Sequence, residues 1–288
     1  KKPYLEKRSN LNLFIAHKKG ALVKKTPDAY GIDKEEHFYF INAYNCIYEC
    51  EYCYLQGFFN SPDLVIFTNW REIQQAISKE ANKNPGCWFH AGEFSDSLAL
   101  SHLTNEIQSY YELFKKLPNE KLELRTKSAN TKVIEQMEPL NNIYISYSIS
   151  TSNTSRKVDH RTPNLNHRLE AIKRLQRIGH KVALHLDPII WTQEWYDEHS
   201  KLIDNLNNQI DLQKISYISL GVVRFTDDVY YQFKKNYPKS IIHQGELKRS
   251  FDNKIRYPKA LRSRMLKMIK DKLIQYKLDP NIIYECME

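Results

Sequence analysis

Three cysteines lie close together in the segment Cys46-Ile-Tyr-Glu-Cys50-Glu-Tyr-Cys53. Their spacing, C-x3-C-x2-C, presents three thiols from one short loop. Thiolates are the soft ligands of iron–sulfur clusters, and three of them can ligate three irons of a cubane while the fourth iron stays open to another molecule. The sequence therefore predicts that Cys46, Cys50 and Cys53 hold a [4Fe-4S] cluster.

Two other interpretations of this loop stay open. A structural zinc ion usually takes four protein ligands in a tetrahedron, and His37 or His90 would have to supply the fourth. The three cysteines could also be plain core residues. The chain holds five cysteines, and the other two, Cys87 and Cys286, lie far from the loop and from each other. An odd number without paired spacing indicates reduced thiols rather than a disulfide framework.

Length and composition indicate a globular protein, most simply one large domain. The chain has 288 residues, of which 41% are apolar and 12% aromatic, enough to bury a sizeable core. It contains no run of 18 apolar residues, and its first residues lack the apolar stretch of a secretory signal. These features predict a soluble cytoplasmic protein without a membrane partner, and a monomer is favoured.

Basic residues are in excess and gather in three parts of the sequence. Forty-three Lys and Arg side chains against 34 Asp and Glu give a formal net charge of +9 at pH 7. The excess lies in residues 18–25, 156–177 and 248–272. Clustered cations favour a polyanionic partner such as nucleic acid, because they neutralise phosphates. Solvated basic faces of surface helices would give the same pattern, so both interpretations stay open.

Short β-like runs alternate with longer helical patterns. Strands are predicted from apolar, β-branched and aromatic residues at 37–43, 87–91, 122–126, 143–149, 182–187 and 215–220. Helices are predicted at 69–81, 101–116, 131–136, 165–179 with Gly179 as the C-cap, 193–206, and from Pro258 onward. This alternation indicates βα units, a parallel sheet, and a closed or partly closed barrel.

The cysteine loop follows the first predicted strand, and in such barrels chemistry takes place on loops at the carboxyl ends of the strands. Three parts of the chain are predicted. An N-terminal extension over residues 1–35 packs on the barrel, the barrel occupies 36–222, and a C-terminal helical and β extension over 223–288 closes it.

The cysteine loop at the end of the first strand resembles that of the radical SAM superfamily, and the string CEYCYLQ resembles the spore photoproduct lyase family in particular. The likeness extends from about Phe38 to the end of the chain. It implies an α/β fold with a partial (βα)6 TIM-like barrel. It also implies a [4Fe-4S] cluster and S-adenosyl-L-methionine as cofactors, with an electron donor such as flavodoxin or ferredoxin. Reductive cleavage of S-adenosylmethionine would yield a 5′-deoxyadenosyl radical that abstracts hydrogen from a substrate.

Short matches along the chain imply which residues bind the cosubstrate. Gly92-Glu93-Phe94-Ser95-Asp96 resembles the family's loop after the second strand, Arg125-Thr126-Lys127 the end of the third, and Ser146-Tyr147-Ser148 the fourth. The cosubstrate contacts implied in this way are Tyr52, Gly92, Glu93, Ser95, Lys127 and Ser148. The Tyr52 ring would pack on the adenine and Lys127 would pair with the methionine carboxylate.

The resemblance also implies catalytic and substrate-binding residues. Tyr54 resembles the family tyrosine that relays a hydrogen atom, and with Tyr52 it forms the predicted catalytic pair. Arg224, which would grip a phosphate, and His185 and Asp187, which end the fifth strand, are the predicted substrate contacts. Structural roles stay open for all five, as core rings, a hydrogen-bonded pair or a surface ion pair.

The match departs from the family at one position. The repair enzyme needs a cysteine just before the Ser-Asp pair to return a hydrogen atom to the product radical, and this chain has Glu93 and Phe94 there. A carboxylate does not readily donate a hydrogen atom. The final donor is therefore Cys87, Cys286 or neither.

The predicted function is a radical SAM, spore photoproduct lyase-like enzyme that acts on a nucleic-acid or nucleotide substrate, in DNA lesion repair or modification. The alternative is a radical SAM enzyme that modifies a small molecule or peptide. A third hypothesis is a nucleic-acid-binding protein whose cysteines hold a structural metal.

Overall fold

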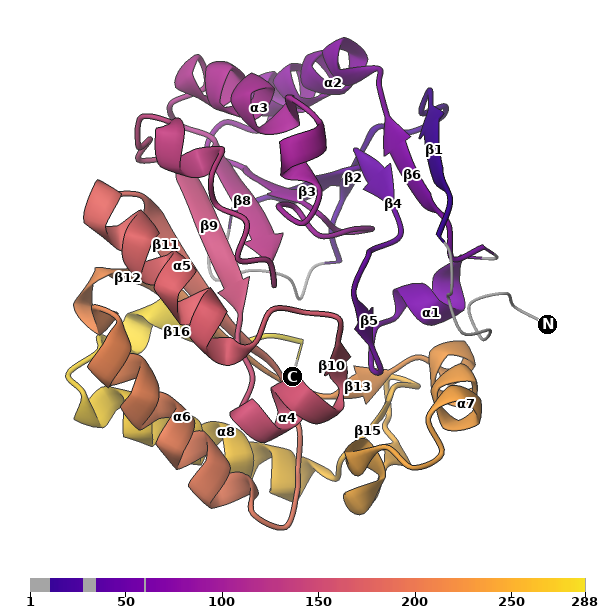
Figure 1. Cartoon of the computed structure of the whole chain (residues 1–288), viewed down its shortest axis with the longest axis vertical. Helices are drawn as coiled ribbons and strands as arrows, with labels where there is room; N and C mark the ends of the chain where they lie inside the picture. Colours follow the sequence, from indigo (N-terminus) through magenta and orange to yellow (C-terminus); the bar gives the residue numbers. More distant parts are fainter. Residues whose placement is uncertain (1–10, 28–34, 60, 288) are drawn as a thin grey trace.

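A curved sheet of mostly parallel strands forms the centre of the molecule (Figure 1). The computed structural model describes residues 11–27, 35–59 and 61–287. Within these residues eight strands pair in the order β16-β12-β11-β9-β8-β7-β3-β2, and every pair is parallel except β2 with β3. Along the chain they are β2 (Val23–Lys25), β3 (His37–Phe40), β7 (Trp88–Ala91), β8 (Lys121–Thr126), β9 (Ile143–Ser148), β11 (Lys181–Ile189), β12 (Ile215–Val222) and β16 (Ile283–Glu285).

The six strands predicted from the sequence are all present, as β3, β7, β8, β9, β11 and β12. Most side chains of β9 and β12 are buried, as expected for parallel strands that are covered on both faces. At the two ends of the order, β16 and β2 each pair with one neighbour among the described residues. The sheet is therefore a partial barrel rather than a closed one, and the prediction of a partial barrel is confirmed.

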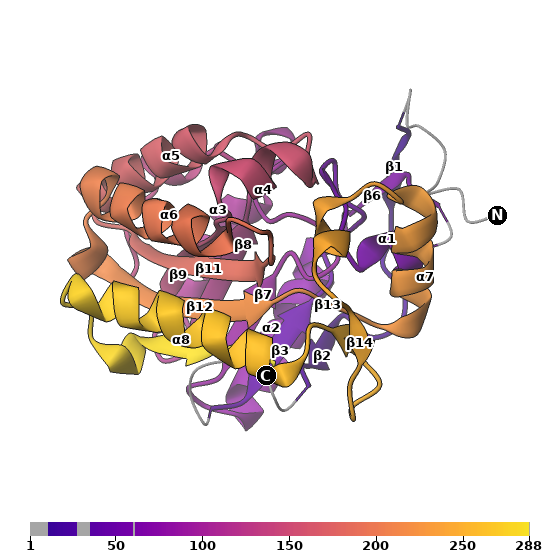
Figure 2. The same cartoon turned by 90° about the horizontal axis from the view of Figure 1, so that it is seen from below.

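Helices lie around the outside of this sheet (Figures 1 and 2). They are α2 (Trp70–Lys83), α3 (Glu106–Lys115), α5 (Leu165–Ile178), α6 (Trp195–Gln209) and α8 (Lys259–Gln275). Each buries one apolar stripe, which in α5 includes Ile172 and Leu175. At the start of α5 the Asn164 side chain accepts a hydrogen bond from His167 N (3.0 Å). At its end Gly179 has φ 104°, a left-handed conformation that glycine adopts without strain, so the predicted C-cap is confirmed.

Two predicted helices are shorter than expected. Residues 101–116 divide into a 3-10 turn (Ser101–Leu103) and α3, because the backbone is extended at Thr104. Residues 131–136 form only a 3-10 turn over Ile134–Gln136. Polar side chains just ahead of that turn bond to nearby backbone, as in Asn130 N to Ser128 Oγ (3.0 Å), and such bonds compete with helix formation.

Several short elements around the cysteines are absent from the sequence-based prediction. One small sheet has the strand order β1 (Leu13–Ala16), β6 (Leu64–Phe67), β4 (Ala43–Tyr44). A second small sheet pairs β5 (Glu49–Cys50) with β10 (Asp159–His160). A third small sheet has the strand order β13 (Arg224–Phe225), β15 (Ile255–Arg256), β14 (Lys248–Arg249). The helices that were not predicted are α1 (Leu55–Phe58), α4 (Ser152–Lys157) and α7 (Asp227–Asn236). Most of these elements are too short to produce a periodic pattern.

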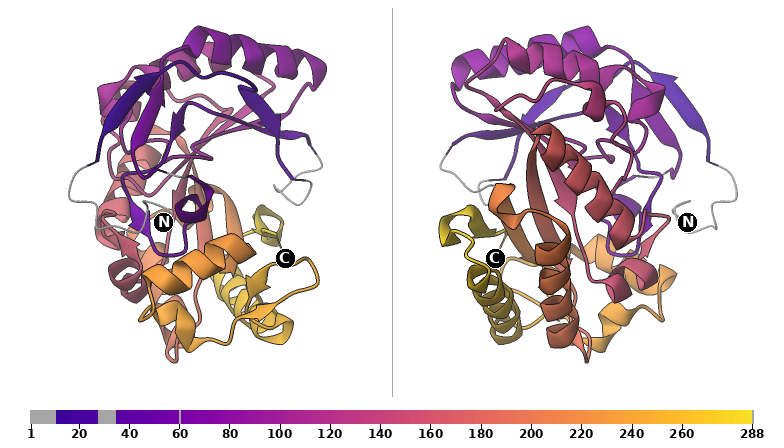
Figure 3. Two further views of the ribbon diagram at one scale, coloured as in Figure 1. Left: turned by 90° about the vertical axis from the view of Figure 1, so that its right-hand side faces the viewer. Right: turned by 60° about the vertical axis from the view of Figure 1, so that its left-hand side comes forward.

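Both predicted extensions contribute a strand to the central sheet. β2, from residues 1–35, pairs antiparallel with β3, and β16, from residues 223–288, pairs parallel with β12. In the left view of Figure 3 the indigo N-terminal part lies at the top and the yellow C-terminal part at the bottom. Residues 1–10 and 28–34 lie outside the described residues, and the division of the chain at 35 and 222 stays a prediction.

Within residues 11–27, 35–59 and 61–287, no helix combines the length and the apolar character that crossing a bilayer requires.

Candidate active site

The cysteine loop starts just after β4 and ends at α1. Its turns are tight, because Cys53 N donates to Cys50 O (3.1 Å) and Gln56 N donates to Cys53 O (3.2 Å). The Gln56 side chain also donates to Cys50 O (2.6 Å). At the start of the loop Asn45 has φ 65°, a left-handed conformation that asparagine tolerates. Folded in this way, the loop brings Cys46, Cys50 and Cys53 to the wall of one cavity.

The thiols of this loop suit a cluster better than a single ion. The five cysteines of the chain, all within the described residues, form no disulfide. Removal from water raises the pKa of Cys46 and Cys50, so metal loading has to displace protons from them. Nowhere in residues 11–27, 35–59 and 61–287 do three or more His, Cys, Asp or Glu side chains converge to hold one metal ion. A cubane instead takes each thiolate on a different iron.

The histidines that a zinc site would need are engaged elsewhere. His37 and His90 lie on the neighbouring strands β3 and β7, with stacked rings, and His37 Nδ1 is 2.9 Å from His90 Nε2. The other ring nitrogen of His90 bonds to Glu123. With both of its nitrogens in hydrogen bonds, His90 is a poor candidate for the fourth zinc ligand.

One carboxylate holds the loop that follows β7. Gly92 begins this loop with φ 82°, and a Cβ there would lie 2.5 Å from Ser97 Oγ, so the turn requires glycine. Asp96 accepts hydrogen bonds from two amides of its own loop, from Thr126 Oγ1 (2.6 Å) and from Lys127 N (2.7 Å). Asp96 thereby ties the loop after β7 to the end of β8. The sequence match contains Asp96, but its positioning role emerges only from these contacts.

Tyr52 and Tyr54, the predicted catalytic residues, flank Cys53 and have different partners. The Tyr52 hydroxyl donates to Asp159, and burial raises the pKa of Tyr52 well above its usual value. The hydroxyl of the exposed Tyr54 donates to the backbone oxygen of Glu93 and lies 3.3 Å from Glu93 Oε1. Glu93, one of the two residues just before the Ser-Asp pair, therefore contacts the tyrosine that would relay hydrogen.

Lys127 places a positive charge beside the cysteine loop. Its Nζ lies 5.5 Å from the centroid of the Tyr52 ring. Burial disfavours the charged form, but the neighbouring Cys50 and Asp159 outweigh this effect and raise the pKa of Lys127. A lysine held charged in this way suits an anionic ligand group, such as the carboxylate of the predicted cosubstrate.

A buried polar network lies behind the cavity and is not predicted from the sequence. Glu123 accepts hydrogen bonds from His185 Nε2 (2.7 Å), Tyr217 OH (2.6 Å) and Arg125 Nη2 (3.0 Å), and it also bonds to His90. Burial raises the pKa of a carboxyl group, but Arg125 and His185 reverse this and hold the pKa of Glu123 well below its usual value. Polar and apolar residues alternate along β8, so no local pattern marks Glu123 as a buried charge that needs partners.

Asp187 and Arg224 form a two-point ion pair at the same edge of the sheet. Arg224 Nη1 and Nη2 donate to the two carboxylate oxygens of Asp187 at 3.3 and 3.1 Å. Burial opposes ionisation of Asp187, yet Arg224 lowers its pKa. The partner of Asp187 is thus Arg224, while His185 bonds to Glu123, and this replaces the direct His185–Asp187 pairing that the sequence left open.

All thirteen predicted site residues line two adjoining cavities. The larger holds about 1560 Å³, including space open to solvent, and is lined by Cys46, Cys50, Cys53, Tyr54, Gly92, Glu93, Ser95, Lys127, Ser148 and Arg224. The second holds about 1020 Å³ on the same measure and adds Tyr52, His185 and Asp187. Cys53, Tyr54, Arg125, Lys127, Ser148 and Arg224 line both cavities, so the two are parts of one site.

A family model described as spore photoproduct lyase matches residues 22–284. The chain belongs to the spore photoproduct lyase family. It is 22% identical over 209 residues to the enzyme of Clostridium acetobutylicum and 24% identical over 214 residues to that of Bacillus subtilis. These matches cover 72% and 73% of this chain but 62% and 63% of the relatives, so the chain spans less than two thirds of their length.

A solved structure shows the same fold. Spore photoproduct lyase complexed with dinucleoside spore photoproduct matches with a TM-score of 0.81 at 20% identity, over 95% of this chain and 82% of that one. The spore photoproduct lyases are radical SAM enzymes, which use a [4Fe-4S] cluster and S-adenosylmethionine. The family resemblance read from the cysteine loop is thus confirmed.

Proposed function

We propose that this chain is a radical SAM enzyme of the spore photoproduct lyase type that abstracts hydrogen from a nucleotide substrate, in repair or modification of a DNA lesion. One observation carries the proposal. The three cysteines line the same cavity as the loop after β7 and the cations Arg125, Lys127 and Arg224. A cluster site, a cosubstrate site and an anion site are thus continuous.

The residues present fit both cofactors of the family. Cys46, Cys50 and Cys53 would hold the [4Fe-4S] cluster. Tyr52, Gly92, Glu93, Ser95, Lys127 and Ser148 would bind S-adenosylmethionine. When bound, the two groups supply the one-electron cleavage that yields a 5′-deoxyadenosyl radical. The chain contributes a loop fixed by Asp96, a cation at Lys127 and the cavity that both residues line.

Two tethered arginines favour a phosphate-bearing substrate. Glu123 accepts from Arg125, and Asp187 holds Arg224 through both oxygens. Both guanidinium groups line both cavities. An arginine that is already oriented binds a phosphate with little further loss of freedom. The dinucleoside bound to a relative of the same fold supports a nucleotide-type substrate.

The placement of the two remaining cysteines favours Cys286 as hydrogen donor. Cys87 precedes β7, at the amino end of the strands and away from the cysteine loop. Cys286 follows β16 at the carboxyl end, donates its amide to Leu220 O (2.7 Å), and its sulfur lies 4.0 Å from Arg224 Nη2. Burial raises the pKa of Cys286. The thiol therefore keeps its hydrogen, which a hydrogen-atom donor must do.

The missing donor cysteine favours a second candidate function. Glu93 and Phe94 stand where the family has that cysteine, and Glu93 contacts Tyr54, so neither residue supplies the thiol that the repair reaction needs. Radical SAM chemistry on a small molecule or peptide would not need a hydrogen donor at this position, so it is compatible with the loss of the cysteine.

Anaerobic reconstitution with iron and sulfide, followed by reduction, tests the proposal. Reduced protein is expected to convert S-adenosylmethionine to 5′-deoxyadenosine, and Cys50→Ala is expected to lose both iron and this product. Cys87→Ala is the matched control and should keep both. Absence of 5′-deoxyadenosine from iron-loaded protein would refute the radical mechanism.

The substrate class needs a separate measurement. Binding of a short oligonucleotide should weaken steeply with salt and should weaken further in Arg224→Ala, while Lys79→Ala, on the outer helix α2, is the control. If 5′-deoxyadenosine forms but oligonucleotide binding does not depend on Arg224 or on salt, the second candidate function is favoured.

A further inference from the structure

A group of exposed cations surrounds the outer side of the cysteine loop. It consists of Arg156 and Lys157 at the end of α4, Arg161 just after β10, and Lys235 and Lys239 at the end of α7, and it is called the basic rim below. The cations that line the cavities are different ones, namely Arg125, Lys127, Arg224 and Lys254. The basic rim is therefore a second positive surface beside the same loop.

Backbone hydrogen bonds connect the basic rim to a cysteine. β5 and β10 pair antiparallel, with Cys50 opposite Asp159 and Glu49 opposite His160. Beyond this pair Glu51 N donates to Val158 O (2.9 Å). Figure 1 shows β10 beside α4, with β5 next to it. Cys50 lies on β5, and β5 pairs directly with β10, so the surface formed by α4 and β10 lies next to the strand that carries Cys50.

The acidic side chains of the same elements are turned inward or paired. Asp159 has no exposed side-chain area and lies 3.6 Å from Arg168. Glu51 is 8% exposed and bonds to His160 (2.9 Å), and Glu49 pairs with Arg161 at 3.3 Å. Glu49 is the most exposed of these three anions, with 25% of its side chain exposed, whereas all five cations of the basic rim are exposed. The basic rim consequently presents a net positive charge.

The end of α7 joins this surface through two contacts. The His160 and Tyr237 rings lie 6.2 Å apart, and Tyr237 stands between Lys235 and Lys239 in the chain. Asn236 Nδ2 donates to Gln56 Oε1 (3.4 Å), which ties α7 to the helix that follows the cysteines. The two lysines therefore belong to the same side of the loop as β10.

We infer that the basic rim is the docking surface of a small acidic electron-transfer protein. The inference rests on the proposed function, in which a centre held by the three cysteines accepts one electron from a donor that is oxidised by one electron. The substrate occupies the cavity when the radical forms, so the electron has to enter from another side. Beside Cys50 the basic rim offers such a side, and opposite charges guide two proteins into contact.

Binding to a flavodoxin, used as the acidic probe, tests this assignment without any turnover. Wild-type protein, with or without its cluster, is expected to bind oxidised flavodoxin at low salt and to lose most of that affinity at high salt. The triple variant Arg156→Glu, Lys157→Glu, Lys239→Glu should weaken binding roughly tenfold. The matched control reverses the charge of three exposed cations on α2 and at the end of α3, in the triple variant Arg71→Glu, Lys79→Glu, Lys116→Glu. This control should leave flavodoxin binding unchanged. Circular dichroism confirms that both triple variants are folded.

A kinetic measurement separates this inference from the proposed function. In the basic-rim variant, cluster reduction by reduced flavodoxin should be slowed about as much as binding is weakened, while reduction by dithionite should match wild type. Equal flavodoxin binding by both triple variants would overturn the inference. Loss of oligonucleotide binding in place of flavodoxin binding would overturn it as well, by assigning the surface to nucleic acid. If dithionite reduces no cluster in wild type, the proposed function fails, and the binding measurement still decides the docking surface.

Discussion

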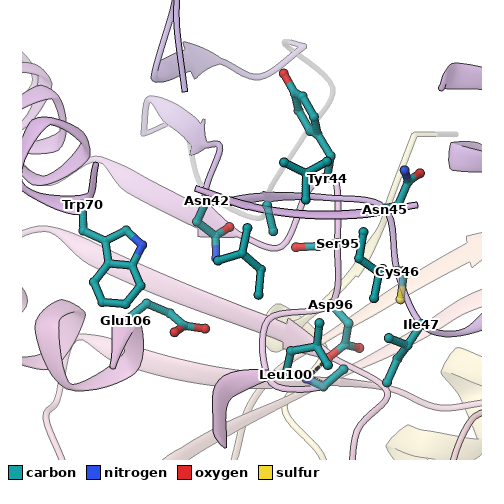
Figure 4. A pocket seen from close by; sticks show the side chains of 15 residues that line it. Asn42, Tyr44, Asn45, Cys46, Ile47, Trp70, Ser95, Asp96, Leu100 and Glu106 are labelled. Carbon is teal, nitrogen blue, oxygen red and sulfur yellow. Dashed lines mark hydrogen bonds between the residues drawn. The ribbon is translucent and has the colours of Figure 1, made fainter. Parts of the chain in front are cut away.

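Replacing Glu106 by Gln is expected to stabilise the protein at neutral and higher pH. Glu106 begins α3, is 8% exposed, and its Oε2 has no hydrogen-bond partner among the described residues. Figure 4 shows its carboxylate near Trp70 at the wall of a smaller cavity of about 490 Å³, which Cys46 also lines. Because burial disfavours the charged form, the pKa of Glu106 is raised from 4.5 to about 7.

The sign and size of the effect follow from these two pKa values. Below pH 4.5 Glu106 is protonated in the folded and unfolded states, and its ionisation does not affect stability. Between pH 4.5 and 7 the unfolded state gains from ionisation while the folded state stays protonated, and above pH 7 both states ionise and the difference levels off. The free energy of unfolding therefore falls by about 1 kcal/mol at pH 5 and about 3 kcal/mol at pH 8 relative to a neutral side chain.

Urea unfolding at pH 5 and pH 8 measures this difference at equal cluster content. Glu106→Gln should exceed wild type in unfolding free energy by about 3 kcal/mol at pH 8 and by about 1 kcal/mol at pH 5. Glu112→Gln, on the exposed face of the same helix, is the control and should change stability by less than about 0.5 kcal/mol at both pH values. A Glu106→Gln effect that does not grow with pH would refute the argument, because it would show that the carboxylate is ionised in the folded state at no cost.

Two further substitutions test the site. Gly92→Ala should lower the unfolding free energy by about 1–3 kcal/mol and weaken S-adenosylmethionine binding, because the new Cβ would lie 2.5 Å from Ser97 Oγ. Gly20→Ala has a positive φ but nothing within 4 Å, so an equal loss in both variants would contradict the steric argument. Cys286→Ala should keep 5′-deoxyadenosine formation but prevent solvent deuterium from entering the product in heavy water, whereas Cys87→Ala should keep both. Deuterated product from Cys286→Ala, detected by mass spectrometry, would exclude this thiol as donor.

The common location of the predicted site residues could be predicted from the sequence more completely than the short elements around them. Residues such as Lys127, Ser148 and Asp187 lie at or near the carboxyl ends of parallel strands, and strands buried on both faces are visible as apolar runs. Once the strands are placed, their ends must share one edge of the sheet. Most of the shorter elements have no such apolar run and could not be placed from the sequence. The run Leu64–Phe67 is an exception, because its apolar residues were a usable strand signal.

Side-chain partners are the part that sequence patterns cannot supply. Glu123 reads as an ordinary polar residue of a strand, yet four side chains converge on it, one from its own strand and one each from β7, β11 and β12. Asp159, which contacts Tyr52 and influences Lys127, is 107 residues away from that tyrosine. Such contacts depend on the register of strands and loops that lie far apart in sequence, and no local pattern encodes that register.

The sequence match to the family fails at the residue that would end the radical reaction, and not at the residues that would start it. The proposed parts for forming the radical are all present around one cavity, from the cysteines to Lys127. Just before the Ser-Asp pair, however, Glu93 and Phe94 offer no thiol hydrogen, and Glu93 contacts Tyr54 instead. Cys286 can replace that donor only if the substrate lies against Arg224, whose guanidinium is 4.0 Å from the sulfur. A shared anchor at Arg224 would therefore fix both the phosphate of the substrate and the place where its radical is quenched.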